Sequence, residues 1–87
     1  MARVFIPAQW RDLTGGDADA VVEGGSLREV LRALESRYPG LAGRLREEGM
    51  IAAGLAVSID GAMTSRGLLA PVRPDSEIHF LPVIGGG

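Results

Sequence analysis

The residues of this chain best placed to do chemistry are its last three, Gly85, Gly86 and Gly87. They follow directly on an apolar segment, residues 78–84. Glycine has no Cβ, adds little buried surface and loses much backbone entropy on ordering, so such an ending does little for a fold. Many chain ends simply fray. A thin tail could instead carry its terminal carboxylate into a narrow crevice on another protein, and this carboxylate is the leading candidate for covalent chemistry.

Most of the side chains used in covalent and metal chemistry are missing from the sequence. There is no cysteine and no lysine, since all nine basic residues are arginine, which excludes disulfides, thiolate ligands and Schiff bases. His79 is the single histidine, and no carboxylate stands at a spacing typical of a triad or a metal site. The acidic residues show no paired-carboxylate pattern. We therefore expect no enzyme activity, no metal and no bound cofactor.

Composition predicts one small soluble domain. The chain has 87 residues, of which 46% are hydrophobic and 23% charged, values too apolar for a disordered protein. Its net charge of -2 and the lack of a basic stripe argue against nucleic acid as a partner. No apolar stretch is long enough to span a bilayer, and the start has no secretory pattern. A cytoplasmic location is the expectation.

One helix is clearly predicted. Ser26 and Glu29 have the spacing of a capping box, which marks a helix start, and Pro39-Gly40 marks its end. Between these signals, apolar residues recur at the spacing of one helical face. The residues expected to face the core are Leu27, Val30, Leu31, Leu34 and Tyr38.

Two segments have weaker patterns. Residues 41–48 are expected to add a short helical turn that ends at Gly49, with Leu41 and Leu45 packed inward. Trp10 follows the first expected strand, and the sequence leaves open whether this side chain is packed or exposed.

Strands are predicted on both sides of the helix, over residues 3–7, 19–23, 55–59 and 77–83. The first two are expected to form a hairpin, and Asp60-Gly61 predicts a tight turn after the third. Residues 62–72 are expected to hold an edge strand and a loop. This order favours an α+β fold in which one helix packs across one face of a mixed sheet. We expect a single domain over residues 1–84 and a flexible tail over residues 85–87.

The last strand is expected to have one buried and one open face. If Ile78 and Phe80 face the core, then His79 and Leu81 point to the other side of the sheet. His79 is expected there as an ordinary surface residue, while Leu81 begins an apolar path to the glycines. A partner could contact the sheet and then grip the tail. The predicted partner-binding residues are Leu81, Pro82, Val83, Ile84, Gly85 and Gly86.

These features together resemble the MoaD/ThiS family of ubiquitin-like sulfur carriers. The resemblance covers nearly the whole chain, including residues 7–13 after the first strand, the helix capped by Ser26, and the turn before the last strand. Its most specific part is the ending, where Pro82 is followed by two apolar residues and the terminal glycines.

The resemblance implies a β-grasp fold and chemistry at the C-terminal glycine. A partner adenylyltransferase would use ATP to convert the carboxylate of Gly87 into an acyl-adenylate, because AMP is a good leaving group. A persulfide or sulfide would then displace AMP, and the resulting thiocarboxylate would donate its sulfur to a second partner, a synthase. Gly85 and Gly86 would lie in a channel too narrow for a Cβ. ATP would thus be used by the partner, with no cofactor held by this chain.

Two details depart from the family pattern. The family usually ends in two glycines, so either Gly87 is the working terminus or a peptidase, such as a metalloprotease, removes it to expose Gly86. The usual Gly-Asp of the last turn is replaced by Asp75-Ser76, which suits a turn equally well.

The pathway that receives the sulfur stays open between alternatives. The ending from Pro82 is similar to that of carriers in molybdopterin synthesis. The Ile6-Pro7 pair and the Tyr38-Pro39-Gly40 segment are more similar to carriers that feed a cysteine synthase, which we favour slightly; a thiamine pathway ranks third. Two other functions compete with the sulfur carrier: a protein modifier joined to lysines of other proteins, and an interaction module with an inert tail.

Overall fold

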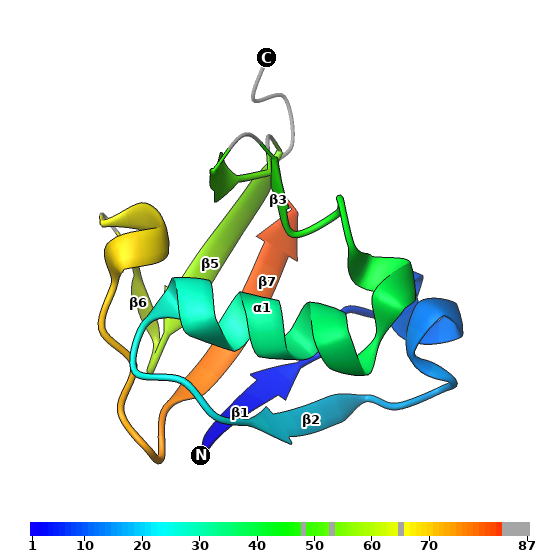
Figure 1. Ribbon diagram of the computed structural model, residues 1–87, viewed down its shortest axis with the longest axis horizontal. Helices are drawn as coiled ribbons and strands as arrows, with labels where there is room; N and C mark the ends of the chain where they lie inside the picture. Colours follow the sequence, from blue (N-terminus) through cyan, green and yellow to red (C-terminus); the bar gives the residue numbers. More distant parts are fainter. Residues whose placement is uncertain (48, 53, 65, 83–87) are drawn as a thin grey trace.

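A mixed five-stranded sheet carries one α-helix across one of its faces (Figure 1). The computed structural model describes residues 1–47, 49–52, 54–64 and 66–82. The strands lie in the order β2-β1-β7-β5-β6, and the helix is α1 (Leu27–Arg37). The strand bounds are β1 (Ala2–Phe5), β2 (Asp19–Val22), β5 (Leu55–Ile59), β6 (Ala62–Met63) and β7 (Glu77–Pro82). The predicted α+β architecture is confirmed.

Strand pairing brings the two ends of the sequence together at the centre of the sheet. β1 pairs antiparallel with β2, which confirms the predicted hairpin. β1 also pairs in parallel with β7, so that Val4 lies beside Ile78. β7 in turn pairs antiparallel with β5 along its whole length, from Leu55 opposite Pro82 to Ile59 opposite Ile78. The central position of β7 fixes the point at which the chain leaves the sheet towards its C-terminus.

The helix forms as the capping pattern predicts and buries the predicted face. The backbone N–H of Glu29 donates to Ser26 Oγ at 3.3 Å, while the Glu29 carboxylate accepts weakly from the N–H of Gly25 at 3.5 Å. This satisfies amide groups that have no partner inside the helix. All of the apolar residues predicted for the inner face of the helix are buried: Leu27, Val30, Leu31, Leu34 and Tyr38.

The segment after the helix differs from the expectation. A 3₁₀ turn, η2 (Pro39–Leu41), follows the helix, but the expected helical turn does not continue to Gly49. Instead β3 (Arg46–Glu47) and β4 (Met50–Ile51) form a small antiparallel ladder. The physical reason is visible in the backbone, because Gly43 and Gly49 have φ values of 84° and 75°, which interrupt a right-handed helix. Leu41 and Leu45 are fully buried, as expected.

Two further 3₁₀ helices complete the fold, η1 (Ala8–Thr14) and η3 (Gly67–Leu69). η1 lies between β1 and β2. It carries Trp10 into the core, where the indole ring lies 5.7 Å from the Phe80 ring in a tilted arrangement. Trp10 is therefore packed.

The Asp60-Gly61 turn joins β5 to β6 and also holds the start of β7. Asp60 has φ of 53° and Gly61 has φ of 84°, as a tight hairpin turn requires. The Asp60 carboxylate accepts from the N–H of Glu77 at 2.9 Å and from Ser76 Oγ at 2.8 Å. Both hydrogen bonds favour the charged carboxylate, the one from Glu77 more than the one from Ser76. They lower the pKa of Asp60 below its ordinary value of 3.8.

This arrangement predicts a loss of stability in acid that depends on Asp60. The pKa of Asp60 is lower in the folded chain than in the unfolded chain. The ionised carboxylate therefore adds to the free energy of unfolding above about pH 4, and this contribution is lost as pH falls through the folded pKa. We expect Asp60→Asn, which also tolerates a positive φ, to lower the melting temperature at neutral pH. The difference from the parent chain should shrink as pH falls below the ordinary carboxyl pKa of 3.8 and Asp60 of the folded chain becomes protonated. Thermal unfolding followed by circular dichroism measures this. Asp75→Asn, an exposed carboxylate before β7, is the matched control; an equal effect there would contradict the assignment.

Candidate functional site

Within residues 1–47, 49–52, 54–64 and 66–82, no group of three or more histidine, cysteine or acidic residues could hold a metal ion. In the same part of the chain, no helix has both the length and the apolar character needed to cross a membrane. The candidate site is the sheet face that adjoins the end of β7.

The sheet face opposite α1 is the outer face, and strand alternation decides which residues point there. Ile78 and Phe80 are buried under the helix, as expected, so His79 and Leu81 lie on the outer face. His79 is half-buried, and Leu81 exposes 43% of its surface. By register, the outer face is formed by Arg3, Phe5, Asp19, Val21, Ala56, Ser58, Met63, Glu77, His79 and Leu81.

A stack of side chains crosses the centre of this face. The Phe5 and His79 rings lie parallel, with centroids 4.4 Å apart and an angle of 4° between their planes. The Arg3 guanidinium sits 5.6 Å from the centroid of the Phe5 ring, in the arrangement of a cation–π contact. Arg3 also pairs with Asp19 at 2.7 Å on the strand that forms the edge. The stack orients the imidazole of His79 against the Phe5 ring on the outer face.

One exposed apolar side chain lies on the outer face near the end of β7. Leu81 lies opposite Ala56 on β5, whereas the exposed Met63 on β6 lies beside Ser58, level with His79. Because β7 ends at Pro82, Leu81 lies one residue before the strand ends and the chain continues towards its glycines. Leu81 is thus where the prediction put it, at the start of that path.

The structure places one more of the predicted partner-binding positions, and the binding role of all of them stays a prediction. Pro82 is the last residue of β7, and its backbone pairs with Leu55. Val83, Ile84, Gly85, Gly86 and Gly87 lie outside the described residues. Their role remains a prediction.

Sequence reasoning placed only His79 and Leu81 on the outer face, and it missed the side chains that build the central stack with His79, Phe5 and Arg3. The alternation of β1 carried a usable signal, since an inward Val4 turns both neighbours outward. The contact between Phe5 and His79 had no local signal, because it depends on the parallel pairing of strands from opposite ends of the chain.

The sheet, the single helix across it and the open face beside the chain end define a small ubiquitin-like domain of the β-grasp type. Residues 4–87 match the model of the ThiS family. The chain belongs to this family of ubiquitin-like sulfur carriers. A search of curated proteins by sequence found no significant match.

Solved structures with the same fold cover the whole chain. A chain in the crystal structure of the Amycolatopsis orientalis BexX/CysO complex is 29% identical, with a TM-score of 0.92 and complete coverage of both chains. CysO of Mycobacterium tuberculosis, an antigen, is 25% identical over 97% of this chain and 100% of that one, with a TM-score of 0.90. Small archaeal modifier protein 1 of Methanosarcina acetivorans shares the fold at 24% identity, over 99% and 95% of the two chains, with a TM-score of 0.84.

Proposed function

We propose that this protein carries sulfur as a thiocarboxylate on its C-terminal glycine, Gly87, after activation by a partner adenylyltransferase. The observation that carries this proposal is the match to the ThiS family model, which extends through the terminal glycines to residue 87. The chain's own composition supports it, since a protein without cysteine or lysine has few other groups for covalent chemistry.

The proposed chemistry has two steps, both at the terminal carboxyl group. A carboxylate oxygen attacks the α-phosphorus of ATP, pyrophosphate leaves, and an acyl-adenylate forms. Sulfide then attacks the carbonyl carbon, and AMP departs with the electron pair of the broken C–O bond. The product is a thiocarboxylate, which a downstream synthase uses as its sulfur source. ATP is bound and spent by the partner, so the carrier needs no cofactor of its own.

The outer face is the proposed docking surface for the activating partner. It carries the Phe5–His79 stack at its centre, and the exposed side chain of Leu81 lies next to the end of β7. A partner that covers Leu81 would have the following residues, from Val83 to the glycines, directed towards its active site. The domain of residues 1–84 then serves as the handle and residues 85–87 as the reactive tail.

A substitution on this face should separate docking from chemistry. We expect Leu81→Glu to raise the KM of the adenylyltransferase for the carrier at least about tenfold, because a charge placed in an apolar contact is poorly solvated. The kcat at saturating carrier should stay within about twofold of the parent value. ATP-dependent pyrophosphate release measures both. Ala42→Glu, an exposed position away from this face, is the control; equal KM values for the two variants would contradict the docking surface.

The direct test of the proposal is reconstitution with a cognate adenylyltransferase, ATP and sulfide, followed by intact-mass analysis. We expect one oxygen to be replaced by one sulfur, only when ATP is present. An unchanged mass with an adenylyltransferase that thiocarboxylates another carrier of the family under the same conditions would contradict the proposal. Isopeptide-linked adducts on lysines of other proteins, with no thiocarboxylate, would support the modifier function instead.

For the receiving pathway, we propose cysteine synthesis ahead of molybdopterin synthesis. The support is the likeness of Ile6-Pro7 and Tyr38-Pro39-Gly40 to carriers that feed a cysteine synthase. Supplying the thiocarboxylated chain to a cysteine synthase and to a molybdopterin synthase large subunit would separate the two, since only the true acceptor should consume the sulfur.

A further inference from the structure

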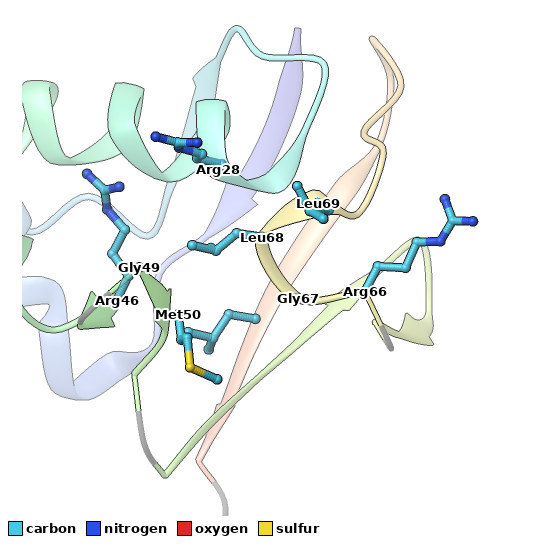
Figure 2. A pocket seen from close by; sticks show the side chains of 9 residues that line it. Arg28, Arg46, Gly49, Met50, Arg66, Gly67, Leu68 and Leu69 are labelled. Carbon is cyan, nitrogen blue, oxygen red and sulfur yellow. The ribbon is translucent and has the colours of Figure 1, made fainter.

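A groove on the helix side of the molecule combines an apolar floor with arginine side chains (Figure 2). Its volume is about 590 Å³, within the range of ligand-sized sites. It is bounded by the first turn of α1, the β3–β4 ladder and η3, which packs against both α1 and β4. We call it the basic groove, and its main lining residues are Arg28, Met50, Ile51, Arg66, Leu68 and Leu69.

Part of the apolar lining of the basic groove is exposed to solvent, unlike the side chains of the core. Leu68 belongs to the core and is only 9% exposed, so it forms a fixed floor. Met50 and Leu69, by contrast, expose 69% and 78% of their surfaces at the rim. Large exposed apolar side chains around a cavity mark a surface that binds something. Methionine is well suited to this position because its flexible side chain adapts to the shape of a partner.

The charge of the groove opposes the overall charge of the chain. Arg46 makes two 3.0 Å hydrogen bonds to Glu35, so its charge is balanced and it fastens β3 to α1. Among the described residues, neither Arg28 nor Arg66 forms an ion pair. In Figure 2, Arg28 lies at one end of the groove near Arg46, and Arg66 extends outward at the other. Two cationic groups thus flank the apolar floor in a protein with a net charge of -2.

We propose that the basic groove docks a short acidic segment of a partner protein. One apolar side chain of that segment would rest on Leu68 between Met50 and Leu69, and its carboxylates would lie beside Arg28 and Arg66. Methionine and arginine are enriched in protein interfaces. A small-molecule site would instead need several buried polar groups that converge on the ligand, whereas the polar side chains lining this groove are arginines.

The basic groove and the outer face lie on different sides of the sheet. The groove is bounded by α1, which covers the inner face, while the outer face is on the opposite side. A partner segment in the groove would therefore leave the Phe5–His79 stack and Leu81 uncovered. The inference is independent of the proposed sulfur chemistry, since it needs neither the tail nor ATP.

A selection with random peptides tests the proposal without assuming the partner. A phage-displayed library of random 12-residue peptides is selected on the full chain, and each enriched peptide is then synthesised. We expect the enriched peptides to combine acidic residues with at least one large apolar residue. In ¹⁵N-labelled full chain, they should shift the amide signals of residues 49–51 and 66–69, and leave those of Phe5, His79 and Leu81 unchanged.

Charge reversal should then weaken binding of the selected peptides. We expect Arg28→Glu combined with Arg66→Glu to raise the Kd at least tenfold, and Met50→Ser combined with Leu69→Ser to do the same. All four side chains are exposed, so the melting temperature should change little. Arg32→Glu combined with Arg44→Glu changes the net charge equally at exposed positions that do not line the groove, and should bind nearly as the parent does.

Two further variants test whether acidic residues or the tail of this chain compete with the peptides for the basic groove. Glu47 and Glu48 follow Arg46 in the sequence, and Glu47→Gln with Glu48→Gln should bind the peptides at least as tightly as the parent chain. A chain shortened by residues 85–87 should bind unchanged, which separates this inference from the function of the tail. Enrichment of basic or uncharged peptides, shifts confined to the outer face, unchanged Kd in the arginine variant, or no enrichment at all would overturn the proposal.

Discussion

Deletion of Gly86 and Gly87 is expected to lower thiocarboxylate formation at least about a hundredfold while the melting temperature stays unchanged. Two residues of extended chain span about 7 Å, so the shortened carboxylate would stop well before the position at which ATP is attacked. A displacement far smaller than this costs about a hundredfold in rate when reacting groups must be aligned. The core is built from residues 2–80, so the fold should not depend on the deletion.

A series of chains that differ only at the C-terminus identifies the glycine that carries the sulfur. In a purified system without any peptidase, modification of the full chain assigns the chemistry to Gly87. Modification only after deletion of Gly87 alone assigns it to Gly86 and implies prior trimming. A chain with one alanine added after Gly87 should fail in both cases. Normal thiocarboxylation after loss of Gly86 and Gly87 would contradict the account, and so would a deletion that unfolds the protein.

The second large effect is expected in the core under the helix. Leu31 is fully buried between α1 and the sheet, and Leu31→Ala should lower the free energy of unfolding by about 2–5 kcal/mol through lost burial and a residual cavity. A domain of this size has only about 5–15 kcal/mol of stability, so the melting temperature should fall by about 10–30 °C. Leu69→Ala removes the same atoms from an exposed side chain. It should change the free energy of unfolding by less than about 0.5 kcal/mol.

Urea unfolding at fixed pH measures both leucine variants. The difference between them tests whether α1 packs on the sheet as described. Equal destabilisation by Leu31→Ala and Leu69→Ala would contradict the assignment of the core.

Local sequence signals predicted the parts of the fold that local physics determines. The Ser26 cap and the apolar spacing from Leu27 to Tyr38 marked α1 to within a residue at each end. The Asp60-Gly61 pair marked a turn whose positive φ angles few other pairs adopt easily. The alternation in β7 separated buried Ile78 from exposed Leu81. In each case, neighbouring residues carry both the signal and the structure.

The parts that were missed depend on contacts between distant segments. The β3–β4 ladder has strands of two residues each, too short to show a periodic pattern. The parallel pairing of β1 with β7 places Phe5 against His79, a contact between residues at opposite ends of the chain. The basic groove is assembled from three segments, near Arg28, Met50 and Leu68. No spacing in the sequence relates these residues, so only the folded chain reveals the groove.

The most direct measurement of the central claim is the chemical state of the C-terminus in the cells that make this protein. The protein should be purified rapidly under native conditions. The undigested protein should then be fragmented in a mass spectrometer, so that the mass of its C-terminal residue is determined separately from that of the rest of the chain. We predict a population in which the terminal glycine has sulfur in place of one oxygen, and its disappearance when the gene for the activating enzyme is deleted. A terminal glycine that is an ordinary carboxylate in every molecule from cells starved of the sulfur acceptor would contradict the account.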